Sequence, residues 1–185
     1  MILTDREIKL ALEKKLIVIE PAPVANAFSS TAVDLTLDPN ITEFRDDVGG
    51  IETAIDPGHR DFNSEITLAR ISDKLVINAT DGYLLKPHRL VLAWSSEYVN
   101  LVSHNRIAAR VEGKSSLARL GLGIHITAPT IHAGFDGHIR LEMVNHGKVP
   151  IRLRVGMRIC QLIFEQTLGT PDKGYHGQFT GQTTI

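Results

Sequence analysis

The sequence HIRLEMVN at residues 138–145 alternates apolar and polar side chains, as a β-strand with one buried face does. The polar turn NHGK at 145–148 follows it and leads into a second alternating run, IRLRV at 151–155. Residues 155–157 turn again into the apolar run ICQLIF at 159–164. Short strands at this spacing predict a mainly β fold of the barrel or jelly-roll type.

A short amphipathic helix is predicted at the start of the chain. Thr4 and Glu7 have the spacing of a capping box, in which each side chain bonds the backbone N–H of the other residue. Ile8 and Ala11 then share one helical face. The helix is therefore expected to pack on the core and to end near Lys15.

The other segments differ in composition and periodicity. Two strand-like runs occur at 16–19 (LIVI) and 32–37 (AVDLTL). The stretch 45–63 is rich in Asp, Gly and Pro and has little periodicity, so a loop or flap that interrupts the sheet is expected there. The tail at 169–185 has glycines among polar residues and is expected to be mobile and to close over a ligand.

Length and composition indicate one globular domain over residues 1–185. The 185 residues are 43% hydrophobic and 22% charged, and no internal repeat divides them. A net charge of -1 argues against binding to DNA or RNA polymers, because sequence-independent binders use an excess of basic side chains to displace counterions from phosphates. No nucleic-acid partner is expected.

The sequence also carries signals of location. No apolar run approaches the roughly 20 residues that span a bilayer, and no basic region followed by an apolar stretch occurs near Met1. The one cysteine, Cys160, cannot form an internal disulfide, which is typical of a reducing compartment. We therefore expect a cytoplasmic protein without a membrane partner.

The run GKSSLARLG at 113–121 is the densest local signal. A glycine and two serines open a predicted helix of one to two turns, which Gly121 closes. Free N–H groups, two hydroxyls, and the side chains of Lys114 and Arg119 are what a phosphate chain needs for charge-assisted hydrogen bonds. The alternative is a capped surface helix with incidental charge, since serine is a common N-cap.

Glu142 is the second candidate. A carboxylate in the middle of an apolar strand is costly to bury unless it is paired, and such groups are enriched at functional sites. If the outer face of this strand is merely exposed, Glu142 is an ordinary surface residue. Alternation alone leaves both interpretations open.

Zinc chemistry and a nucleophilic cysteine or serine are both disfavoured. Zinc-dependent nucleobase deaminases need an H-x-E motif and a later C-x-x-C pair, whereas this chain has neither, despite eight histidines that include His132 and His138. No G-x-S-x-G elbow presents a serine, and Cys160 lies within an apolar strand pattern typical of a core thiol. No protein-bound metal is expected.

These motifs together resemble the dCTP deaminase branch of the dUTPase-like superfamily, over nearly the whole chain. The resemblance rests on GKSSLARLG at 113–121, ITAP at 126–129, AGFDGHIRLE at 133–142, Pro150, Gly156 with Met157, the opening Leu3-Thr4-Asp5 with Ile8, the strand Val33-Asp34-Leu35, and Tyr175 with Gln178. It implies a homotrimer of distorted β-barrels, with the short N-terminal helix and a short helix at Ser115–Arg119, and with active sites between subunits.

The resemblance also implies a hydrolase that deaminates dCTP to dUTP and ammonia in pyrimidine deoxynucleotide metabolism. Mg²⁺ would be carried on the triphosphate, and no zinc is involved. Glu142 would be the general acid/base for water attacking C4. Ser115 and the carbonyl of Ala128 would hold that water, and Arg119 would stabilise the charges around it.

Substrate contacts follow from the same resemblance. They would come from the loop and helix residues Lys114, Ser115, Ser116, Leu117, Ala118 and Arg119, from His132, from the strand residues Arg140, Leu141, Glu142 and Gln161, and from the tail residues Tyr175 and Gln178.

Two departures from the family bear on function. Many relatives have an aspartate where this chain has His132, and in dUTPases and bifunctional members that aspartate supports phosphate hydrolysis. In addition, relatives have a lysine directly before the tail tyrosine, where this chain has Gly174. The alternatives are therefore a dUTPase or a bifunctional enzyme that yields dUMP and pyrophosphate, which His132 disfavours. A third alternative is a nucleotide-binding regulator without catalytic activity. The joint presence of Ser115, Arg119 and Glu142 disfavours this alternative.

Overall fold

The computed structural model describes residues 1–47, 54–102, 105–172, 181 and 183–184, and within them the protein is mainly β. The elements are α1 (Asp5–Glu13), β1 (Ile17–Glu20), η1 (Ala25–Ala27), β2 (Val33–Phe44), α2 (Ser64–Ile71), β3 (Ser72–Val76), β4 (Tyr83–Leu85), β5 (Leu90–Leu101), β6 (Ile107–Gly113), α3 (Ser115–Ala118), β7 (Leu122–Gly123), β8 (Thr130–Ile131), β9 (Asp136–Asn145), β10 (Ile151–Leu153) and β11 (Arg158–Gln166).

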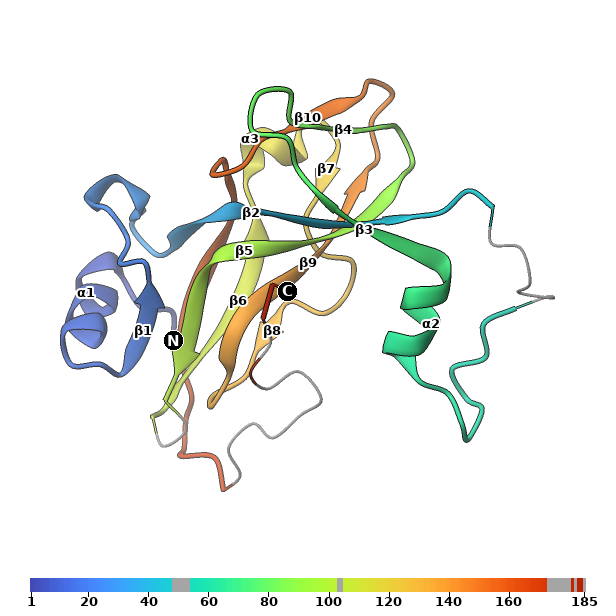
Figure 1. Ribbon diagram of the computed structural model, residues 1–185. Helices are drawn as coiled ribbons and strands as arrows, with labels where there is room; N and C mark the ends of the chain where they lie inside the picture. The colour runs from blue at the N-terminus through green and yellow to red at the C-terminus, as the bar shows by residue number, and fades with distance from the viewer. Residues whose placement is uncertain (48–53, 103–104, 173–180, 182, 185) are drawn as a thin grey trace.

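One curled sheet contains most of these strands (Figure 1). Its strand order is β7-β9-β5-β2-β11-β6-β8, with β1 also pairing with β5 and β3 with β2, while β4 and β10 form a separate pair. Buried aliphatic side chains from α1, β2, β5, β9 and β11 fill its interior. Burial of this apolar surface is the main force that holds the sheet in its curled form.

The alternation predicted at 138–145 is confirmed in β9. Every second residue of the strand is buried, and Ile139, Leu141 and Met143 are 3% exposed or less, while Arg140 and Glu142 are half-buried on the opposite face. The twelve-residue strand β5 pairs along β9, with Leu92 opposite Glu142. The general-base candidate is therefore held by a long ladder, with its side chain directed away from the core.

Helix α1 forms where it is expected and buries Ile8 and Ala11, but it ends at Glu13 instead of near Lys15. Lys15 has a positive φ of 55°, which is outside the helical region. The predicted capping box is wrong in detail, because the Thr4 hydroxyl donates to the Glu7 carboxylate instead of accepting a backbone N–H. That bond holds the pKa of Glu7 below its usual value.

The region predicted as a loop at 45–63 is irregular where it is described, but it leads into helix α2, which was not expected. The Asn63 side chain caps this helix by accepting the Ile66 N–H at 3.0 Å. In Figure 1, α2 extends to one side of the curled sheet. The last residue of the predicted loop is thus the start signal for a helix.

The strand predicted at 151–155 is shorter in the structure. It ends at Leu153 and pairs with β4, although β9 precedes it in the chain. Both edges of β9 are already occupied by β5 and β7, so no ladder is left for β10 there. Residues 155–157 do form the predicted turn, with the Gly156 N–H donating to the carbonyl of Leu37 at 2.8 Å.

Asn145 anchors the turn that follows β9. Its side chain is fully buried and donates to the carbonyls of Leu85, at 3.0 Å, and Val149, at 2.9 Å. Its Oδ1 accepts the Gly147 N–H at 2.9 Å. One amide thus satisfies three backbone groups and ties the end of β9 to β4.

The same turn touches the end of the segment that contains α3. The His146 N–H donates to the carbonyl of Gly121 at 2.7 Å, and Gly121 has a φ of +94°. A Cβ on Gly121 would lie 2.5 Å from the Gly147 nitrogen, so only glycine allows this approach. We name this contact between 121 and 145–147 the glycine joint.

Substituting Gly121→Ala is expected to lower the free energy of unfolding by about 3 kcal/mol, from backbone strain at positive φ and overlap with rigid backbone atoms. Gly156→Ala is the matched control, since Gly156 also has a positive φ, 75°, but nothing lies within 4 Å of an added Cβ. It should cost only about 1 kcal/mol. Urea unfolding of both variants measures the difference, and equal losses would show that the joint is not close-packed.

Candidate functional site

The outer face of β9 presents an arginine and a carboxylate two residues apart. The Arg140 guanidinium lies over the Trp94 ring of β5, 5.2 Å from its centroid, and pairs at 3.3 Å with Glu65 from α2. Within the described residues its Nε, which is buried, has no hydrogen-bond partner. Glu142 lies on the same face and is half-buried, so it is neither a core residue nor a fully exposed one.

The predicted helix in GKSSLARLG is confirmed as α3, although it spans only Ser115–Ala118. Lys114 is its N-cap residue, and the Gly121 N–H closes the segment on the carbonyl of Ala118 at 2.9 Å. The predicted contact residues Ser115, Ser116, Ala118 and Arg119 are exposed, whereas Leu117 packs against the core. The apolar anchor leaves the hydroxyls and the guanidinium available at the surface.

Lys114 does not point freely into solvent. Its Nζ lies 2.5 Å from Oδ1 of Asp34 in β2, and Arg158 lies 3.7 Å from the other oxygen of the same carboxylate. Arg158 also donates to the backbone carbonyl and side-chain oxygen of Asn26 in η1. The sequence did not identify Asp34 as a charge partner in this site. The alternation of the run at 32–37 does place the Asp34 side chain on the face opposite the apolar residues.

Gln161 reaches the same place from β11. It pairs with Asp34 of β2 on one side and with Glu112 of β6 on the other, and its amide donates to the carbonyl of Gly113 at 3.4 Å. The structure therefore brings together Lys114 and Gln161, two predicted contact residues that lie 47 positions apart in the numbering.

The segment with Ala128 lies beside β6. The carbonyl of Pro129 accepts the Val111 N–H at 2.8 Å, and β8 pairs with the same strand. Ala128 and His132 are both exposed. Upstream, His125 has a buried Nδ1 without a hydrogen-bond partner among the described residues, a polar group that the sequence pattern did not single out.

The tail returns to the start of β9. The Gly181 N–H donates to the carbonyl of Asp136 at 2.7 Å. Tyr175 and Gln178, the two tail residues in the predicted site, lie outside the described residues. The expected closure of the tail over a ligand therefore stays a prediction.

Cys160 is a core thiol, as its sequence context predicts. It is fully buried, and this burial raises its pKa well above the ordinary value. A thiol that is neither exposed nor ionised has no nucleophilic role. Among the described residues no three His, Cys, Asp or Glu side chains gather as metal ligands do, and the expectation of zinc-free chemistry continues to rest on the missing sequence motifs.

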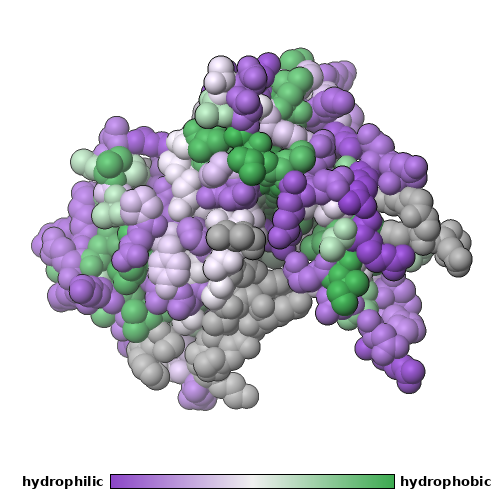
Figure 2. Space-filling view, in the orientation of Figure 1, coloured by the Kyte–Doolittle hydropathy of each residue, from purple (hydrophilic) through white to green (hydrophobic). Residues whose placement is uncertain are grey.

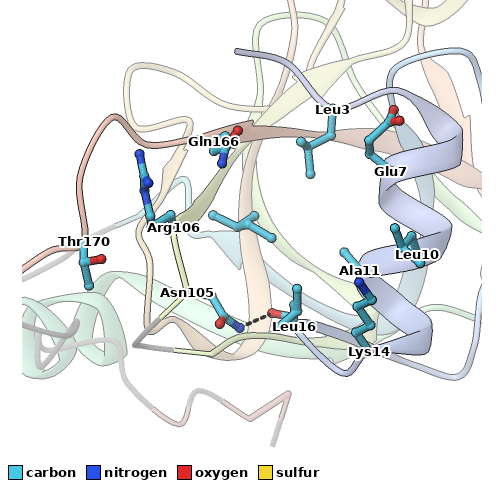
Figure 3. A pocket seen from close by; sticks show the side chains of 11 residues that line it. Leu3, Glu7, Leu10, Ala11, Lys14, Leu16, Asn105, Arg106, Gln166 and Thr170 are labelled. Atoms are coloured by element: carbon cyan, nitrogen blue, oxygen red, sulfur yellow. Dashed lines mark hydrogen bonds between the residues drawn. The ribbon is translucent and has the colours of Figure 1, made fainter.

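A cavity of about 450 Å³ lies away from all of these residues, between α1 and the ends of β6 and β11 (Figure 3). Its polar groups are largely occupied, since Asn105 donates to the carbonyl of Leu16 and Arg106 donates to that of Thr167. None of the predicted site residues lines it. The cavity is therefore not part of the candidate site.

Comparisons with known proteins agree with this architecture. A family model described as dCTP deaminase-like matches residues 2–167. The "dCTP deaminase" of Shewanella amazonensis is 39% identical over 177 residues, which cover 95% of this chain and 89% of that protein. The "dCTP deaminase, dUMP-forming" of Persephonella marina is 33% identical over 182 residues, which cover 98% and 93%.

Among solved structures, the 2'-deoxycytidine 5'-triphosphate deaminase from Agrobacterium tumefaciens superposes with a TM-score of 0.67 at 21% identity. The match covers 89% of this chain and 48% of that one, so the chain spans about half the length of that structure.

The curled sheet with few short helices is a distorted β-barrel of the dUTPase-like type, as the sequence predicts. Within that class, the chain belongs to the dCTP deaminase-like family. No helix in the described part of the chain is long and apolar enough to cross a membrane.

Proposed function

We propose that this protein catalyses hydrolytic deamination of dCTP, in which water replaces the C4 amino group and dUTP and ammonia leave. The observation that carries the proposal is Glu142, a half-buried carboxylate on the outer face of β9 in a chain of the dCTP deaminase-like family. A carboxylate held in a ladder can stay in one place while it accepts and returns a proton.

In the proposed mechanism Glu142 takes one proton from the attacking water and delivers it to N3 of the pyrimidine. It then takes the second proton from the new C4 hydroxyl and delivers it to the amino group, which leaves as ammonia while the C4 carbonyl forms. The Ser115 hydroxyl and the carbonyl of Ala128 hold the water, and Arg119 stabilises the negative charge beside them. The exposure of Ser115, Ala128 and Arg119 supports this assignment, because a substrate can reach them without any movement of the core.

The triphosphate is proposed to bind along the start of α3. Lys114, Ser116 and Arg119 supply an ammonium, a hydroxyl and a guanidinium there, and Mg²⁺ on the triphosphate would offset the remaining charge. Arg140 and Leu141 would flank the base through their backbone, His132 would contact the sugar, and Gln161, Tyr175 and Gln178 would close the site with the tail.

The assembly and location belong to the same proposal. We propose a homotrimer in which sites form between subunits, located in the cytoplasm, where a lone reduced cysteine such as Cys160 is usual. Figure 2 shows apolar side chains gathered at the end of the molecule that carries α3, β4 and β10; the exposed apolar residues of these segments and their turns are Leu84, Leu120, Val149 and Val155. A second copy that covers this surface would remove it from water.

A second candidate is a bifunctional enzyme that carries dCTP through to dUMP and pyrophosphate. The Persephonella marina relative, described as dUMP-forming, favours it. His132 disfavours it, because an imidazole that is partly protonated is a weaker base for a hydrolytic water than a carboxylate.

Product analysis with dCTP and Mg²⁺ separates the two candidates. We expect ammonia and dUTP in equal amounts. Ammonia with dUMP and pyrophosphate would establish the bifunctional reaction, binding without turnover would indicate a regulator, and cleavage of dUTP without action on dCTP would indicate a dUTPase.

Glu142→Gln is expected to lower ammonia release by a factor of roughly 10² or more, because the amide keeps its volume but cannot transfer a proton. The binding of dCTP should persist. Glu165→Gln is the matched control, since Glu165 is also partly exposed on a strand and pairs with Arg110. Ammonia release that survives in Glu142→Gln would overturn the role of this residue.

Light scattering after size-exclusion chromatography tests the assembly, with an expected mass three times the 20.4 kDa of the chain. Val149→Glu, at a residue 73% exposed, should weaken the trimer by placing a charge in the apolar surface. Leu168→Glu, at a residue 98% exposed and outside that surface, should leave it intact. A monomer for the unmodified chain would contradict the proposal.

A further inference from the structure

We propose that Asp34 is a positioning residue for triphosphate recognition, and that it acts by holding the Lys114 ammonium at the start of α3. The inference rests on the proposed function, because that function makes Lys114 a phosphate contact. It adds a residue on a different strand, 80 positions away from Lys114, which acts through the Lys114 side chain.

The geometry shows a carboxylate between two cations. Oδ1 of Asp34 accepts from Lys114 at 2.5 Å, and its Oδ2 lies 3.7 Å from Arg158. The Asp34 side chain is only 12% exposed and that of Lys114 25%, so water screens this interaction less than it screens a pair on the open surface. The cluster as a whole keeps one net positive charge.

Arg158 stays in place without Asp34. It donates to the carbonyl of Asn26 at 2.7 Å and to the Asn26 side-chain oxygen at 2.5 Å, so η1 holds its guanidinium. Lys114 has a flexible four-carbon side chain and no comparable second anchor within the described residues. If the carboxylate were neutral, repulsion from the fixed guanidinium would move the ammonium into solvent.

The Asp34–Lys114 pair lies next to the proposed phosphate contacts at the start of α3. Lys114 is the N-cap residue of α3, directly before Ser115, and Asp34 pairs in the sheet with Gln161, whose amide bonds the carbonyl of Gly113. The ammonium has three N–H groups, so the one that donates to Asp34 leaves two for phosphate oxygens. A cation that is already ordered loses less conformational freedom when the triphosphate binds.

The test measures the binding of inorganic triphosphate by calorimetry and the KM and kcat for dCTP, both with Mg²⁺. Asp34→Asn, which keeps the volume and removes the charge, should raise the Kd for inorganic triphosphate and the KM for dCTP by roughly three- to tenfold. The kcat should stay within about twofold, because the phosphates are remote from C4.

Two controls isolate the role of Lys114. Asp38→Asn makes the same charge change on the same strand, at a carboxylate that accepts from Asn40 and forms no ion pair within the described residues, and it should leave both constants unchanged. In a Lys114→Met background, Asp34→Asn should have no further effect, because the residue through which Asp34 acts is gone. If Asp34→Asn does not fold, Asp34→Glu, which shifts the carboxylate by one methylene, should give a smaller loss that is also absent without Lys114.

Each outcome decides the inference. An unchanged or lower Kd in Asp34→Asn, a fall in melting temperature alone, or an equal loss with and without Lys114 would overturn it. If the unmodified protein binds inorganic triphosphate but releases no ammonia from dCTP, the proposed deamination fails, and the calorimetric comparison still tests the coupling. If the unmodified protein binds no triphosphate, the inference fails as well.

Discussion

The glycine joint is the contact on which the candidate site depends. It brings the backbone at Gly121 against the backbone at Gly147 without any side chain between them, and the buried Asn145 holds the second of these segments in place. Because β9 leads into this turn and α3 leads into Gly121, a change in the joint would move Ser115 relative to Glu142. The relative positions of the two candidate residues thus depend on a backbone contact outside the candidate site itself.

The remaining parts of the site are attached to strands that are central in the sheet. Gln161 lies in β11, which β2 and β6 flank, and Glu142 lies in β9 beside the long strand β5. Rigid strands place the groups that need accurate positions, whereas the exposed residues after α3 and the segment near Ala128 lie in turns. This division is usual for enzymes, in which a stable scaffold presents loops that meet the ligand.

The sequence predicted the parts of the fold that depend on local periodicity. The alternation at 138–145 was enough for β9, and GKSSLARLG was enough for the presence of α3, although this helix ends at Ala118, before Gly121. The partner of β10 could not be predicted, because strand pairing depends on which edges other strands already occupy. The pairing of Lys114 with Asp34 was missed for a similar reason, since the two residues meet only when the sheet is complete.

The contact between Trp94 and Arg140 offers a way to detect ligand binding. Trp94 is the only tryptophan of the chain, and it lies on the strand beside β9, opposite Arg140 and two ladder positions along from Glu142. The fluorescence of an indole depends on the local electric field, to which a neighbouring guanidinium contributes. Any ligand that displaces Arg140 or excludes water there changes that field. The protein therefore carries its own fluorescent reporter beside the candidate site.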